Sequence, residues 1–120
     1  MSLRALTLRE ARCSFTLALS KLVLYAQTIG YQVAFDEVTE HLTTRDPTSD
    51  HTPGSLHHLG LAGDLILYKD GLYLSASEDY EPLGLWWVQY GIDHELPLAW
   101  GGNFTKPDGN HFSLAWKGRQ

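Results

Sequence analysis

The chain has 120 residues, a formal net charge of -5 and a single cysteine, and it is 43% hydrophobic and 19% charged. These values are typical of one globular domain with its own hydrophobic core, here residues 1–120, and they exclude an internal disulfide. The acidic balance disfavours nucleic acid as a partner, because DNA and RNA phosphates would repel it. We expect the protein to act as a monomer.

The first predicted element is a long amphipathic helix. Thr7 and Glu10 fit a capping box, and Gly30 fits the residue that ends a helix. Between them, apolar residues recur at helical spacing: Leu8, Ala11, Phe15, Ala18, Leu19, Leu22, Val23 and Ala26. Cys13 falls inside this helix, where we expect it to be packed rather than reactive.

The early part of the chain carries no targeting signal that we identify. Its most apolar stretch, residues 13–19, follows several charged residues and is soon broken by Lys21, so we predict neither a signal peptide nor a membrane-spanning helix. We therefore expect synthesis in the cytoplasm without membrane insertion, and a separate export route for any role outside the cell.

A mostly antiparallel sheet is predicted after the helix. Apolar and polar residues alternate over 31–36, which indicates a strand, and residues 43–54 are rich in Thr, Asp and Pro, which indicates a surface loop. Strands over 64–68 and 72–74 flank Lys69-Asp70-Gly71, a hairpin signal. A final strand is predicted over 111–116.

A second helix is predicted over 78–90, with Pro82 in its first turn and Gly91 at its end. Its apolar stripe consists of Leu83, Trp86, Trp87 and Tyr90. Together with the sheet and the first helix, this pattern predicts a small α+β domain.

Polar residues at the ends of these strands suggest a metal site. His57 ends the polar loop, Asp64 opens one predicted strand and His111 opens another, so the three can meet at one end of the sheet. Two imidazoles and a carboxylate suit zinc with one coordination position left open for water. Asp108, three residues before His111, is well placed to act as the base for that water.

The residues alone leave alternatives open. His58 is adjacent to His57, and neighbouring side chains on extended backbone point in opposite directions, so spacing does not choose between them. Asp64 is also an ordinary strand-start residue, and Asp108 lies in a Pro-Asp-Gly-Asn sequence that is typical of a turn.

Two motifs resemble those of the zinc D-alanyl-D-alanine carboxypeptidase and L-alanyl-D-glutamate endopeptidase family. The first is Ser55-x-His57-x-x-x-Leu61-Ala62-x-Asp64-Leu65, and the second is Trp100-Gly-Gly102 followed by Asp108-x-x-His111-Phe112. The similarity runs from about residue 31 to residue 116 and is closest to short phage-encoded members. It implies a fold like that of the Hedgehog and DD-peptidase domains.

The resemblance also implies roles for individual residues. It implies that Zn²⁺ is held by His57, Asp64 and His111, and that Asp108 is the catalytic acid/base. Arg45 is the candidate for the family's substrate-steadying arginine, with a solvated loop arginine as the other interpretation. Many relatives have Glu where Ser113 stands here, and similar phage sequences also have Ser.

Two further residues are candidates for substrate binding. Ser55 is expected either to hydrogen-bond near His57 and orient it, or simply to cap the loop. Trp100 is expected either to line the cleft or to belong to the core.

The resemblance implies a peptide substrate, the stem peptide of bacterial peptidoglycan. For a phage-type protein it implies an endolysin that waits in the host cytoplasm and reaches the periplasm and cell wall at host lysis. Which bond is cut stays open between the L-Ala to D-Glu bond, the terminal D-Ala pair and a cross-link. The alternatives are a non-catalytic zinc module, a virion protein used in entry, and a hydrolase based on Ser or Cys. The last is disfavoured because Gly54-Ser55-Leu56-His57 is no nucleophile elbow.

Overall fold

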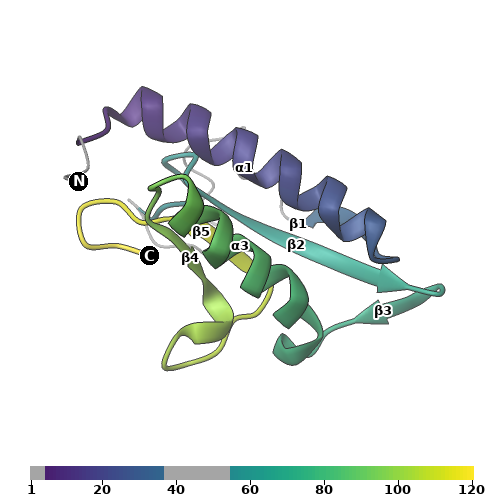
Figure 1. Ribbon diagram of the computed structural model, residues 1–120. Coiled ribbons are helices and arrows are strands. Elements are labelled where there is room, and N and C mark those ends of the chain that lie inside the picture. The colour runs from purple at the N-terminus through teal and green to yellow at the C-terminus, as the bar shows by residue number, and fades with distance from the viewer. Residues whose placement is uncertain (1–4, 37–54) are drawn as a thin grey trace.

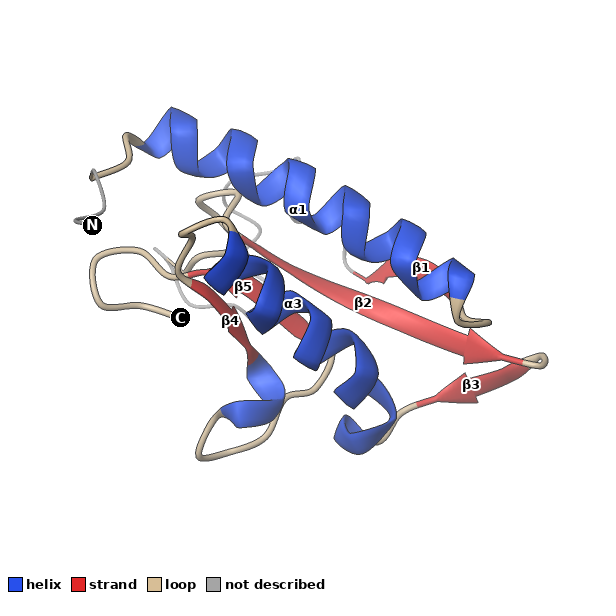
Figure 2. Ribbon diagram, viewed as in Figure 1, coloured by secondary structure: helices blue, strands red, loops and turns tan. Residues whose placement is uncertain are grey.

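Residues 5–36 and 55–120 are described by the computed structural model, in which helices cover an antiparallel sheet (Figures 1 and 2). The α-helices are α1 (Leu8–Thr28) and α3 (Glu81–Asp93), the 3-10 turns are η1 (Ser77–Tyr80) and η2 (Gly101–Asn103), and the strands are β1 (Gln32–Asp36), β2 (Ala62–Lys69), β3 (Leu72–Leu74), β4 (Leu98–Trp100) and β5 (His111–Leu114). The predicted loop over 43–54 lies outside the described residues.

Helix α1 begins at the predicted capping box. Thr7 Oγ1 accepts from the Glu10 backbone N–H at 3.1 Å, and the Glu10 carboxylate accepts from the Thr7 N–H at 3.0 Å. The prediction that Cys13 is packed is wrong, because its side chain is exposed. The buried stripe runs along the helix at positions that leave Cys13 on the solvent side: Ala11, Phe15, Ala18, Leu19, Leu22 and Ala26.

The sheet has the order β1-β2-β5-β4, with β3 also paired to β2, and all of these pairings are antiparallel. The β2–β3 hairpin is confirmed, and its turn residues Asp70 and Gly71 have φ of 53° and 78°, as a tight hairpin turn requires. Strand β2 begins at Ala62, so Asp64 lies inside the strand rather than at its start.

Helix α3 differs from the prediction at both ends. It is preceded by the 3-10 turn η1, and it continues past Gly91 to Asp93. Gly91 is buried within the helix, where a Cβ atom would come within 2.7 Å of the Leu96 carbonyl oxygen. This glycine therefore allows close packing of the returning chain and does not end the helix.

One hydrophobic core lies between the helices and one face of the sheet (Figure 2). The Trp87 ring of α3 contacts Phe15 of α1 and Phe112 of β5, each with a centroid distance of 5.8 Å. Since side chains alternate along a strand, the neighbours of Phe112 on β5 point to the opposite face. His111, Ser113 and Asp64 therefore lie on the face of the sheet opposite to α1 and α3.

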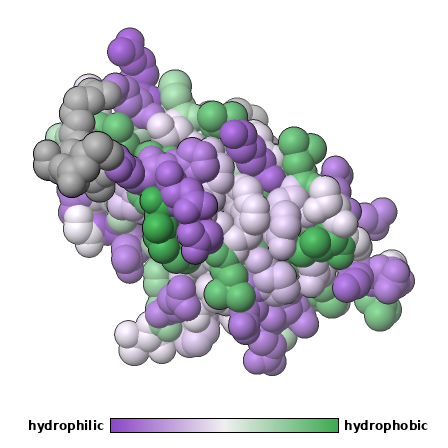
Figure 3. Space-filling view, in the orientation of Figure 1, coloured by the Kyte–Doolittle hydropathy of each residue, from purple (hydrophilic) through white to green (hydrophobic). Residues whose placement is uncertain are grey.

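The outer surface is mixed in character. Figure 3 shows hydrophobic residues scattered among hydrophilic ones on the face in view. The exposed large apolar side chains come from several elements: Leu17, Leu24, Phe35, Leu72, Tyr73, Leu85 and Ile92. Among the residues that the structure describes, no helix has the length and apolar character needed to cross a membrane.

Candidate metal centre

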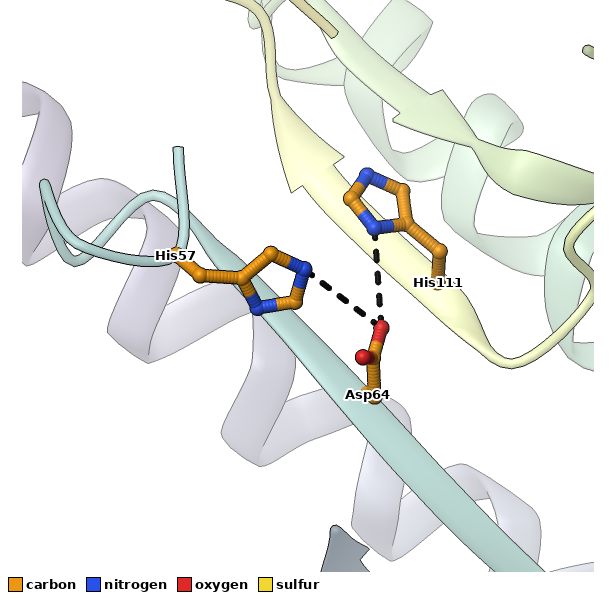
Figure 4. A group of neighbouring side chains, drawn as sticks. All are labelled: His57, Asp64 and His111. Carbon is orange, nitrogen blue, oxygen red and sulfur yellow. Dashed lines mark ion pairs between the residues drawn. The ribbon is translucent and has the colours of Figure 1, made fainter. Parts of the chain in front are cut away.

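The strand register brings two of the predicted ligands together. Asp64 on β2 is the direct cross-strand partner of His111 on β5, and directly paired side chains share one face of the sheet. His111 Nδ1 lies 3.5 Å from Asp64 Oδ1. The two residues are separated widely in sequence, but the pairing of their strands places them side by side (Figure 4).

The third predicted ligand comes from the segment that precedes β2. His57 Nε2 lies 3.6 Å from the same oxygen, Asp64 Oδ1. The segment folds as successive turns in which the Leu61 N–H donates to the Leu56 carbonyl at 2.9 Å. From α1, the Arg12 Nε–H donates to the Leu59 carbonyl at 2.6 Å and ties the segment to the helix. The cluster contains His57 and not His58.

The three side chains fit a metal ion in chemistry and in spacing. One donor atom from each lies within 4.8 Å of the other two. Two ligands of a tetrahedral zinc ion stand about 3.4 Å apart, which is close to the two measured separations from Asp64. His57 and His111 are buried, at 6% and 7% exposure, so the donor atoms are largely withdrawn from water.

A second carboxylate adds negative charge beside this cluster. Asp36 on β1 pairs with Asp64 from the other side in the strand register. Carboxylates placed directly opposite one another repel, and a bound cation relieves that repulsion. The arrangement therefore favours occupation by a positive ion.

The electrostatic environment raises the pKa of His111. Burial by itself lowers the pKa of this imidazole, but the Asp64 carboxylate, the Gln120 carbonyl and the negative charge of Asp108 together outweigh burial. The protonated form is thus favoured in the absence of metal. A metal ion that binds Nδ1 must displace this proton.

Asp108 lies at the other end of the turn that leads into His111. The His111 N–H donates to the Asp108 carbonyl at 3.1 Å, and the Asp108 N–H donates to the Gly101 carbonyl at 2.9 Å. The Asp108 side chain is exposed, and it is not part of the metal-ligand cluster. Asp108 is therefore an exposed residue in the turn beside the cluster, and its charge acts on His111.

Trp100 supports this turn from within the core. Its side chain is only 7% exposed, and its indole N–H donates to the Gly109 carbonyl at 2.6 Å. The ring fits between Gly84 and Gly102, where an added Cβ atom would clash with it. Trp100 also lines a surface hollow of about 360 Å³ with residues that include Glu78 and Pro107. Its substrate-binding role stays a prediction.

The other two predicted site residues are Arg45 and Ser55. Arg45 lies outside the described residues. Ser55 is the first described residue of its segment, and its buried Oγ makes no hydrogen bond with any residue that the structure describes. The expected hydrogen bond from Ser55 to the neighbourhood of His57 is therefore not seen among these residues.

Several supporting groups were not predicted. The Gln120 carbonyl contacts His111 Nε2 at 2.7 Å and accepts from Ser113 Oγ at 2.6 Å. Ser77 Oγ accepts from the Gly109 N–H at 2.9 Å. Arg12 ties down the His57 segment. The Ser77 and Arg12 contacts join residues 32 and 47 positions apart, and the Gln120 contacts use a main-chain oxygen, so no local side-chain pattern predicts them.

The fold is similar to that of a solved peptidase. The crystal structure of Serratia marcescens L-Ala D-Glu endopeptidase ChiX matches with a TM-score of 0.64 and 20% sequence identity, covering 90% of this chain and 83% of that chain. No family model matches the chain, and no curated protein matches its sequence. The structural likeness confirms the predicted α+β, DD-peptidase-like fold.

Proposed function

We propose that the chain is a zinc-dependent peptidase that cleaves an amide bond in the stem peptide of bacterial peptidoglycan. The observation that carries this proposal is the convergence of His57, Asp64 and His111 on the face of the sheet opposite to α1 and α3, with Asp108 in the adjoining turn. The likeness in fold to an L-Ala D-Glu endopeptidase supports the choice of substrate class.

The residues divide the proposed chemistry between them. Zinc bound by two histidines and a carboxylate supplies Lewis acidity toward a carbonyl group and toward water. The exposed Asp108 carboxylate takes the proton from the attacking water and returns it to the leaving amine. The His111–Asp108 turn, held by Trp100 and Ser77, keeps this carboxylate next to the ligand cluster.

The biological setting is part of the same proposal. The motif resemblance to short phage-encoded members favours an endolysin that accumulates in the host cytoplasm and reaches the wall at lysis. Arg45 is proposed to steady the substrate and the charge that develops on its carbonyl oxygen.

The test separates metal binding from hydrolysis. Asp108→Ala should keep zinc, measured by metal analysis, but lose hydrolysis of purified peptidoglycan by about 10²–10⁴-fold, because the proton acceptor is gone. His111→Ala should lose both. Asp93→Ala, which removes an exposed carboxylate at the end of α3, is the control and should retain both.

Mass spectrometry of the digested muropeptides identifies the bond that is cut. Full activity of Asp108→Ala would refute the assignment of the base, and activity that survives prolonged chelation would remove the metal from the mechanism. Stoichiometric zinc binding without any hydrolysis would instead support a non-catalytic zinc module.

A further inference from the structure

The end of the chain turns back onto the metal-ligand face of the sheet. After β5, Trp116 and Arg119 form an isolated antiparallel bridge, with N–H to carbonyl distances of 2.9 Å in both directions. The two residues between them, Lys117 and Gly118, have φ of 47° and 80°, as in a type I′ turn. Figure 1 shows this segment in yellow, leaving β5 and curving back toward the sheet.

This turn delivers the Gln120 main-chain carbonyl to two side chains on one face of β5. Its oxygen lies 2.7 Å from His111 Nε2 and 2.6 Å from Ser113 Oγ. Ser113 is fully buried, at 0% exposure. Since the hydroxyl donates its hydrogen to this oxygen, the carbonyl is held from one side by Ser113 while it contacts His111 on the other.

The contact determines which ring nitrogen of His111 carries hydrogen. A main-chain oxygen, whether of a carbonyl or of a carboxylate, only accepts, so Nε2 must donate an N–H to it. In neutral His111 the lone pair is then on Nδ1, the atom that lies 3.5 Å from Asp64 Oδ1. The opposite tautomer would set the Nε2 lone pair against the carbonyl oxygen inside a buried site, which is unfavourable.

We propose that the Gln120 carbonyl is a positioning group for His111, held in place by Ser113 and by the turn at Gly118. It selects the Nε2–H tautomer and orients the ring so that Nδ1 faces the cluster before any metal binds. The importance of this Gln120–His111 contact for catalysis rests on the proposed zinc function. The tautomer of His111, in contrast, is a property of the metal-free protein. Removal of such a partner of a metal-binding histidine typically weakens metal binding by about ten- to hundredfold.

Gly118→Pro tests the proposal, because proline cannot adopt the positive φ of this turn and Gly118 has no atoms near its Cβ position. The variant should carry the Gln120 carbonyl away from His111 without disturbing the core. Gln120→Ala is the matched control, since it keeps the main-chain carbonyl and removes only the side chain. Ser113→Ala removes one of the two contacts on the carbonyl and should have an intermediate effect.

The first readout is the ¹⁵N spectrum of the metal-free protein, at a pH where His111 is neutral and with the signals assigned by comparison with His111→Gln. Wild type and Gln120→Ala should show the Nε2–H tautomer, and Gly118→Pro should show a mixture. The second readout is zinc affinity by chelator competition, which should fall about ten- to hundredfold in Gly118→Pro.

An unchanged tautomer in folded Gly118→Pro would overturn the proposal, as would a shifted tautomer in Gln120→Ala. If proline prevents folding, Gly118→Val strains the same turn and is judged by the same two outcomes. A tautomer shift in a protein that hydrolyses no peptidoglycan would support the positioning role and count against the proposed function alone.

Discussion

The two sides of the metal-ligand cluster are built in different ways. Asp64 and His111 belong to paired strands, so the hydrogen-bond register of the sheet sets their separation. His57 belongs to a segment of turns outside the sheet, and its place depends on local hydrogen bonds and on the Arg12 contact with Leu59. The strand-borne pair is therefore expected to keep its geometry without metal, whereas the turn-borne ligand is expected to be the more adaptable one.

This difference shows why the aspartate is central to the cluster. Asp64 Oδ1 lies 3.6 Å from His57 Nε2 and 3.5 Å from His111 Nδ1, so one carboxylate oxygen joins the rigid side to the adaptable side. Changes on the two sides should therefore differ in their effects on zinc binding and on stability.

Removing the shared aspartate should have the largest effect. Asp64→Ala is expected to lower zinc affinity by more than about 100-fold, because it deletes a ligand. Removing only the hydrogen-bond partner of a ligand typically costs about ten- to hundredfold. His57→Ala should lose less zinc affinity, because Asp64 and His111 remain on their paired strands. Isothermal titration calorimetry of both variants measures this order, and a greater loss in His57→Ala would contradict the comparison.

Zinc should stabilise the folded protein, and it should protect the segment 55–61 more than the strands β2 and β5. Zinc at 100 times its Kd is expected to raise the free energy of unfolding by about 2.7 kcal/mol, because only the folded chain has the assembled site. Hydrogen exchange should slow more over 55–61 than in β2 or β5, since the turn segment has more order to gain. A chelator should reverse this slowing of hydrogen exchange. Equal slowing in all three segments would show that the two sides of the cluster do not differ in rigidity.

The raised pKa of His111 predicts opposite pH dependences for metal binding and for metal-free stability. Zinc affinity should fall by about tenfold per pH unit as the pH drops below this pKa, because the proton competes for Nδ1. In the metal-free protein, the stability that protonated His111 contributes is complete below the unfolded-state pKa of about 6.5 and is lost as the pH rises through the folded-state value.

Urea unfolding of the metal-free protein across this pH range measures that loss. The variant His111→Gln, which has no titrating ring at this position, is the control. A slope of the same size in His111→Gln would assign the pH dependence to another group.

Of the four changes predicted here, loss of the Arg12 contact should have the smallest effect on zinc affinity and stability. Arg12→Met keeps much of the apolar stem but loses the hydrogen bond to Leu59, which costs about 1 kcal/mol for an exposed contact of this kind. Zinc affinity should fall by less than about tenfold, through looser placement of His57 alone. Arg9→Met makes the same change of charge earlier on α1, and an equal loss there would show that the effect is one of charge and not of the contact.

Sequence reasoning was effective where a pattern is local. The capping box of α1, the β2–β3 hairpin and the α+β class follow from spacing within short windows, and each is confirmed. The motif resemblance implied the set His57, Asp64 and His111, and the structure brings these three side chains together. Gly91 misled the prediction because glycine serves both to end helices and to admit close packing, and only the tertiary structure distinguishes the two.

The supporting contacts could not be predicted for a physical reason. The Gln120 oxygen that contacts His111 belongs to the main chain, so no side-chain pattern marks it as the partner of His111. The hydrogen bond of Arg12 likewise goes to a main-chain oxygen 47 positions along the chain. The choice of His57 over His58 depended on the turns of 55–61, whose geometry is set by packing against α1.

The Trp100 ring fits between Gly84 and Gly102, so the residues allowed at these three positions depend on one another. A methyl group at either glycine displaces the indole and, through its bond to the Gly109 carbonyl, shifts the loop that bears Asp108. Directed evolution of this scaffold should accept a larger residue at position 84 or 102 only together with a smaller one at position 100. Libraries that vary these sites one at a time will find few active clones, whereas libraries that vary them jointly can recover the coupled solutions.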